Sequence, residues 1–195
     1  GVLIERNTGA APVFFQLDAA GSIGRSFAGT GAAPTIRSTT GPMDVIFNAG
    51  TGGGAFNSLS FSGNSAADRA TIATQGGNVT MQVAGGTFSN LSAFNTDIDT
   101  GGGNLTLQAG TPGAAGTNST VSLNAAQVAT GGGALSMAAY GDGAYVGVGS
   151  GTQITTDGGG VSILTGQPGA PAGSVDVTAA LIDTRAGQSD AGAGG

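Results

Sequence analysis

The chain of 195 residues contains no lysine, histidine, cysteine or tryptophan. Without histidine and cysteine it cannot by itself build a Ser-His-Asp triad, a Cys-His dyad, a zinc finger or a cysteine-ligated iron–sulfur cluster. No apolar run approaches the roughly 18 residues that a membrane-spanning helix needs. The sequence therefore predicts no transmembrane segment and no centre of these kinds.

Charge is also scarce. Charged residues make up 8% of the chain, against about 25% in an average domain. The chain has five arginines, ten aspartates and one glutamate, which give a net charge of −6 and a pI near 4.1. Nucleic-acid binding depends on clustered cations, so we expect no nucleic-acid partner. A hydrophobic content of 39% favours a folded chain over a disordered one.

Glycine is abundant, with 40 residues, about three times its usual share of the chain. This excludes an ordinary helical domain. The first residues include neither an initiator methionine nor a secretory signal pattern. We therefore expect a segment of a longer chain, and the glycines at 192, 194 and 195 stop where another structural unit should begin.

A repeat anchored on Ile-x-Thr runs through most of the sequence. The clear copies are 72–74, 98–100, 128–130, 154–156 and 182–184, with a weaker copy at 36–38. The five clear copies are 26, 30, 26 and 28 residues apart. A period of this length indicates a solenoid.

Each repeat holds three short segments with strand character. Four anchors lead into glycines and then an alternating strand, at 79–81, 105–107, 135–137 and 161–163. A second strand recurs in mid-repeat, at 121–123, 146–148 and 175–177, with a looser counterpart at 88–94. The third strand contains Ile-x-Thr. Alternation of apolar and polar residues marks half-buried strands, and three strands in one repeat leave no room for a helix.

These strands predict an all-β fold, a parallel β-helix with three short strands per coil of about 26–30 residues. Stacked coils would align the anchors Ile72, Ile98, Val128, Ile154 and Ile182 in one inward column. The threonine two residues after each anchor shares the inward side and is expected to hydrogen-bond the turn backbone. Thr80, Thr106, Ser136 and Ser162 would form an outward, uncharged column. Insertions are expected at one corner, between the first and second strands.

Residues 1–71 fit the repeat less well than residues 72–195. The spacing from Ile36 to Ile72 stretches to 36 residues. Six phenylalanines lie in this part: Phe14, Phe15, Phe27, Phe47, Phe56 and Phe61. We predict irregular coils of the same helix with larger core residues, continuous with the regular coils as one domain. Seven coils in all would give a rod of roughly 30–35 Å.

The string Ile-Asp-Thr-Gly-Gly-Gly-Asn-Leu-Thr-Leu at 98–107 has echoes at 72–81, 128–137 and 154–163. It resembles the β-strand repeats of filamentous-haemagglutinin-like adhesins of two-partner secretion and of related autotransporter-type passengers. The resemblance covers residues 72–195 well and the remainder loosely. It implies a right-handed β-helical stalk, extracellular or on the bacterial cell surface, that serves adhesion, biofilm or filament structure. It transfers no catalytic residue.

Asp97 and Asp99 are the nearest approach to an acid–base pair. On one strand they would point the same way, about 6.5–7 Å apart, a separation discussed for glycoside hydrolysis. However, Asp99 occupies the same repeat position as Ala73, Ala129, Thr155 and Asp183. The position is therefore outward and permissive, and we interpret both as solvated turn carboxylates. Sugar-cleaving β-helices have clustered carboxylates or cations beside an acidic cluster, and the nearest arginine in sequence is Arg69.

Other site patterns are weaker. Asp97, Asp99, Asp142 and Asp157 stand near glycine-rich turns, but neither the calcium-binding nonapeptide nor an EF-hand spacing occurs. The glycine blocks 101–103, 131–133 and 158–160 lack the lysine and helix of a phosphate loop and are interpreted as corner turns. Four sequons begin at Asn78, Asn90, Asn104 and Asn118 and are interpreted as surface chemistry, not glycosylation sites.

The sequence thus assigns no catalytic, cofactor-binding or metal-binding residue and no cofactor. The predicted function is a structural or adhesive segment, not an enzyme. The alternatives are a carbohydrate-active β-helix enzyme, of lyase or hydrolase type, and a glycan-binding module. After residue 184 no cap is recognisable, because 185–193 looks like an enlarged corner loop. We therefore expect end-to-end self-association or continuation of the chain, with surface glycans or proteins as further partners.

Overall fold

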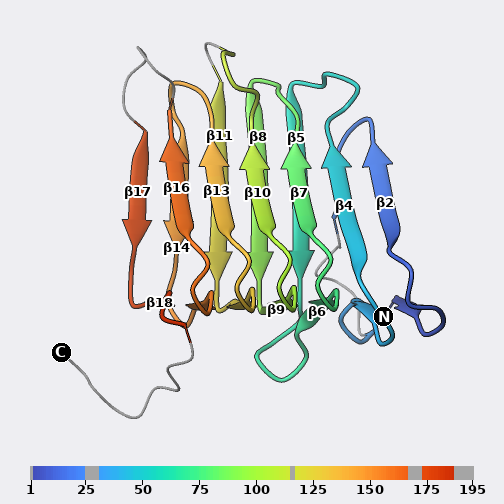
Figure 1. The fold of residues 1–195 in the computed structure, drawn as a ribbon. Coiled ribbons are helices and arrows are strands. Elements are labelled where there is room, and N and C mark those ends of the chain that lie inside the picture. Colours follow the sequence, from blue (N-terminus) through green and yellow to red (C-terminus); the bar gives the residue numbers. More distant parts are fainter. Residues whose placement is uncertain (1, 25–30, 115–116, 167–172, 187–195) are drawn as a thin grey trace.

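The computed structural model describes residues 2–24, 31–114, 117–166 and 173–186 (Figure 1). Within these residues the chain forms 18 strands and no helix. The strands belong to three sheets, and every neighbouring pair in a sheet is parallel. The fold is the parallel β-helix that the repeat predicts, with three strands per coil.

The three sheets form the sides of the solenoid. Sheet A contains β1 (Leu3–Arg6), β3 (Thr35–Ser38), β6 (Ala70–Ala73), β9 (Thr96–Asp99), β12 (Gln127–Ala129), β15 (Gln153–Thr155) and β18 (Leu181–Asp183). Sheet B contains β2 (Val13–Ala19), β4 (Met43–Ala49), β7 (Val79–Val83), β10 (Leu105–Ala109), β13 (Leu135–Ala139) and β16 (Val161–Thr165). Sheet C contains β5 (Phe56–Ser62), β8 (Phe88–Phe94), β11 (Asn118–Asn124), β14 (Tyr145–Val148) and β17 (Ser174–Val177).

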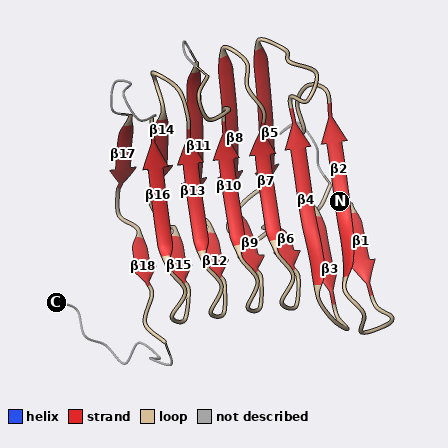
Figure 2. Ribbon diagram, turned by 45° about the horizontal axis from the view of Figure 1, so that its top comes forward, coloured by secondary structure: helices blue, strands red, loops and turns tan. Residues whose placement is uncertain are grey.

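Successive coils lie side by side in chain order along the solenoid (Figure 1). The short strands of sheet A lie in a row beside the ends at which the strands of sheet B begin (Figure 2). Sheet A has seven strands but sheet B has six, so the chain makes about six turns and not the seven coils expected. Among the described residues of the first coil, an isolated bridge from Ile23 to Leu59 is the only contribution to sheet C.

The register of the regular coils matches the predicted columns. Ile72 pairs with Ile98, Ile98 with Val128, and the column continues through Ile154 to Ile182. The inward side chains form one core along the solenoid, and those of the central coils are almost fully buried. Burial of this apolar ladder contributes about 25 cal/mol per Å² and is the main force that holds neighbouring coils together.

The first coils confirm part of the prediction for residues 1–71. Phe15, Phe47 and Phe61 pack together, with ring centroids 5.9 and 6.0 Å apart. The expectation of core residues is wrong for Phe14 and Phe56, which are 71% and 73% exposed. Consecutive residues of a strand point to opposite faces, so Phe14 and Phe15 cannot both be buried. Phe27 lies outside the described residues.

Insertions occur at more than one corner. A loop at residues 63–69, between β5 and β6, holds a bridge between Ser65 and Asp68 and accounts for much of the long spacing before Ile72. The prediction of a single variable corner is therefore wrong, because this loop joins sheet C to sheet A. The expected glycine pair and the greater part of the C-terminal loop lie at 187–195, outside the described residues.

Candidate functional site

The corner between sheets A and B is the most regular polar feature of the molecule. The threonine that follows each anchor is fully buried at positions 74, 100, 130 and 156. Thr74 Oγ1 donates to the carbonyl oxygen of Gly77 at 2.6 Å, and the same contact recurs from Thr100, Thr130 and Thr156 to the glycine three residues on. The predicted role of this threonine in the turn is confirmed.

The same corner joins each coil to the next. The amide of Gly76 donates to Thr100 O at 2.6 Å, and that of Gly102 donates to Thr130 O at 2.7 Å. Pairing of buried backbone groups avoids a cost of about 1–3 kcal/mol for each group left unpaired. The interpretation of the glycine blocks as corner turns is confirmed.

The glycine three residues after each buried threonine lies against the neighbouring coil. A Cβ atom on Gly103 would lie 2.1 Å from Gly77 O, and one on Gly133 would lie 2.0 Å from Gly103 O. No side chain fits there, which explains why the third residue after the threonine is a glycine in every regular coil.

Two of the four sequon asparagines belong to this corner. Asn78 Oδ1 accepts a hydrogen bond from the amide of Asn104 at 2.9 Å, and Asn104 Oδ1 accepts one from the amide of Ala134 at 2.8 Å. Asp44 makes the equivalent contact with the amide of Asn78 at 2.7 Å. These side chains form a ladder that satisfies one backbone donor per coil. The other two, at 90 and 118, lie on the outer face of sheet C.

Asp97 and Asp99 lie on the outer side of β9, as predicted, and line one shallow depression of about 180 Å³. Gln127, Gln153 and Thr155 line the same depression. Asp99 Oδ1 accepts a hydrogen bond from the amide of Gly101 at 2.9 Å, which makes it a turn carboxylate. Asp97 is different, because it forms an ion pair that sequence reasoning missed.

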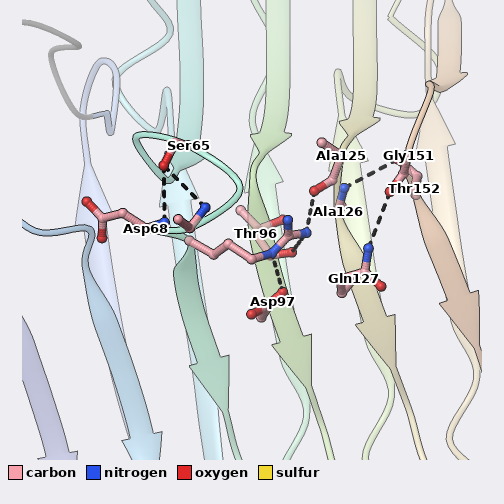
Figure 3. Close-up of polar contacts among 11 residues, drawn as sticks. Ser65, Asp68, Thr96, Asp97, Ala125, Ala126, Gln127, Gly151 and Thr152 are labelled. Atoms are coloured by element: carbon pink, nitrogen blue, oxygen red, sulfur yellow. Dashed lines mark hydrogen bonds and ion pairs between the residues drawn. The ribbon is translucent and has the colours of Figure 1, made fainter.

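The partner of Asp97 is Arg69, whose side chain is only 17% exposed. Arg69 Nε lies 2.5 Å from Asp97 Oδ1, and Nη2 donates to the carbonyl oxygens of Thr96 and Ala125 (Figure 3). One guanidinium thus reaches two further coils. The register of β6 against β9 could have predicted this ion pair. Thr71 lies opposite Asp97, and Arg69 is only two residues before Thr71.

The remaining aspartates named for calcium are scattered. Asp142 lies between β13 and β14, at the corner of sheets B and C, whereas Asp157 lies between β15 and β16, at the corner of sheets A and B. In the part of the chain that the structure describes, no three acidic, histidine or cysteine side chains come together as a metal-binding group. One carboxyl has a displaced pKa: the Arg185 guanidinium hydrogen-bonds Asp183 and lowers its pKa to about 2.

Sheet C carries a groove that the sequence did not reveal. Two exposed rings, Phe56 and Phe88, stack on its outer face with centroids 5.0 Å apart and planes within 5°. Together with Ser22, Asn57, Ser58, Ser89, Asn90, Asn118 and Thr120 they line a groove of about 370 Å³.

No family model matches the chain, and no curated protein or solved structure is significantly similar to it. The resemblance to filamentous-haemagglutinin-like proteins therefore stays a prediction. Across the described residues we find no helix long and apolar enough to cross a membrane.

Proposed function

We propose that the chain is a structural or adhesive segment of a secreted or cell-surface protein, a stalk or filament building block with no catalysis of its own. The observation that carries this proposal is the repeated corner between sheets A and B. Its most repetitive residues, threonine and glycine, are occupied in hydrogen bonds and close backbone packing between coils. The repeat thus serves to build a rod.

The outer faces of the regular coils are consistent with such a rod. Thr80, Thr106, Ser136 and Ser162 follow one another in register on sheet B, without a charge. Asp97 is held by Arg69, and Asp99 is held by its own turn. Both carboxylates therefore have structural partners.

The location is tested on the organism that produces the chain. Antibodies raised against the purified chain should label intact cells or detect the protein in the medium. A signal that appears only after the cells are lysed would overturn the proposed location. A cytoplasmic marker protein, probed on the same intact cells, is the control for leakage.

The last described coil favours end-to-end contact with a second copy of the chain. Leu164, Val175 and Val177 are each nearly half exposed there, whereas their partners one coil earlier, Ala138, Val146 and Val148, are buried. Parallel strands with a free edge pair readily with further strands. Light scattering of the purified chain should show association that grows with concentration, and electron microscopy should show particles elongated along the rod. A strictly monomeric rod at high concentration would contradict this part of the proposal.

A carbohydrate-active enzyme is the second candidate, and the depression that Asp97 and Asp99 share is the observation in its favour. The purified chain should release no reducing or unsaturated sugar ends from a panel of polysaccharides. If it does, and the double variant Asp97→Ala, Asp99→Ala does not, the structural proposal fails. An Asp157→Ala variant, changed at an exposed turn outside the depression, is the matched control.

A further inference from the structure

The groove on sheet C is the surface feature that the rod architecture does not explain. It lies over β5, β8 and β11, and neighbouring positions of the three strands form its walls. Phe56 pairs with Phe88, and Phe88 pairs with Asn118, so two rings and an amide follow one another along the solenoid. The next outward positions are Ser58, Asn90 and Thr120.

The two rings are left partly in water, with exposed fractions of 73% for Phe56 and 43% for Phe88. They stack on each other, and among the described residues no other ring stacks on Phe56. An aromatic face kept in water costs free energy that a ligand with an apolar face recovers on binding. Exposed apolar surface rimmed by polar groups is typical of binding sites.

The other lining groups are amides and hydroxyls. Asn90 and Asn118 are both exposed, and each carries a donor and an acceptor. Among the described residues none that lines the groove is charged, in a chain whose net charge is −6, so the groove matches a neutral ligand rich in hydroxyl groups. A pyranose ring has both required properties, a face of C–H groups and an edge of hydroxyls.

The floor of the groove is polar as well. Asn57 is 3% exposed, and its Nδ2 donates to the carbonyl oxygens of Gly54 and Gly85 at 2.8 and 3.0 Å. Its Oδ1 is buried and accepts no hydrogen bond from the described residues. An unpaired buried acceptor is destabilising.

We propose that this groove binds a neutral saccharide, with a pyranose ring stacked on Phe56 and its hydroxyls hydrogen-bonded by Asn90 and Asn118. The inference rests on the adhesive side of the proposed function and gives it a ligand class. A shallow site of this size fits weak binding, with a dissociation constant of about 1 mM or somewhat below.

The probes are three neutral trisaccharides, maltotriose, cellotriose and triacetylchitotriose, and one acidic control, trigalacturonate. Saturation-transfer NMR on the whole chain should detect at least one neutral sugar, with the strongest transfer to the C–H protons of one ring face. Phe56→Ser and Phe88→Ser should each weaken that sugar's binding at least about tenfold.

Phe94→Ser is the matched control. Phe94 lies on the same strand and the same face as Phe88, is 40% exposed, and is outside the groove. It should leave binding unchanged. Circular dichroism of each variant verifies that the fold is retained, and Asn118→Ala replaces any phenylalanine variant that does not fold.

Several outcomes would overturn the saccharide site. These are no binding of any neutral sugar, binding of the acidic sugar alone, and binding that Phe56→Ser leaves intact. Association of the chain that Phe56→Ser abolishes, without sugar binding, would assign the rings to a contact between copies instead. The proposed rod does not depend on any of these results, and neither does the enzyme test at Asp97 and Asp99, which lie on sheet A. Failure of this inference and failure of the proposed function are therefore distinguishable.

Discussion

Replacing Gly133 with alanine should destabilise the protein far more than a single methyl group ordinarily does. The new Cβ would lie 2.0 Å from Gly103 O, about 1.4 Å closer than an ordinary van der Waals contact allows. Relief requires the two coils to separate at this corner. The hydrogen bond from the amide of Gly102 to Thr130 O, which is 2.7 Å long, opposes this movement.

The expected cost is about 3 kcal/mol, from overpacking of about 1–3 kcal/mol together with the weakening of a corner hydrogen bond. This is a large share of the roughly 5–15 kcal/mol that stabilises a typical domain. The midpoint of thermal unfolding, followed by the β-sheet signal in circular dichroism, should fall by about 6–12 °C for a chain of this length.

Gly160→Ala is the matched control. No atom lies within 4 Å of a Cβ built at Gly160, and the equivalent position one coil earlier is already an alanine, Ala134. Neither Gly133 nor Gly160 has a positive φ, so backbone strain does not separate them. The control should lie within about 0.5 kcal/mol of the original protein. Equal losses in the two variants, or no loss in Gly133→Ala, would refute the close-packing explanation.

Three further changes test other contacts. Thr130→Val keeps the shape of a buried side chain but removes its hydroxyl, so urea unfolding should show a loss of about 1–2 kcal/mol, whereas Thr106→Val on the outer face of sheet B should be nearly neutral. Arg69→Met removes the hydrogen bonds that reach two other coils and should cost about 1–3 kcal/mol in the same assay; no change would show that the contacts contribute nothing. Asp183 has a pKa of about 2 against an ordinary 3.8, so its charged form contributes stability above about pH 4 that is lost as the pH falls toward 2. NMR titration should place its midpoint near 2, and Arg185→Gln should move it back toward 3.8.

The regular coils could be predicted because one pattern repeats in them without interruption. Ile98 and Val128 pair as the spacing of Ile-x-Thr implies, although that spacing varies by four residues. The first coils could not be aligned in this way. Ile4 pairs with Ile36, but neither is followed by threonine, and the loop at 63–69 displaces the next anchor. Because these anchors lack the threonine and the loops between them are long, the regular spacing on which the prediction depended is interrupted here.

The groove shows what a repeat-based analysis overlooks. Strands β5 and β8 both begin with phenylalanine and have seven residues, Phe-Asn-Ser-Leu-Ser-Phe-Ser and Phe-Ser-Asn-Leu-Ser-Ala-Phe. Aligned with each other, they place Phe56 beside Phe88. In the sequence alone, the first belongs to an irregular region and the second is a loose counterpart of a regular strand. Their pairing became visible only once the coils were stacked.

Every strand of the solenoid pairs only with the equivalent strands of the coils directly before and after it. A recombination event that duplicates one whole repeat, for example the 26 residues from Val128 to Gln153, would therefore insert a coil whose two faces already match its neighbours. Loss of a repeat would join compatible faces in the same way. The gene can thus lengthen or shorten the rod in steps of one coil, about 4.8 Å each, without a new core having to evolve.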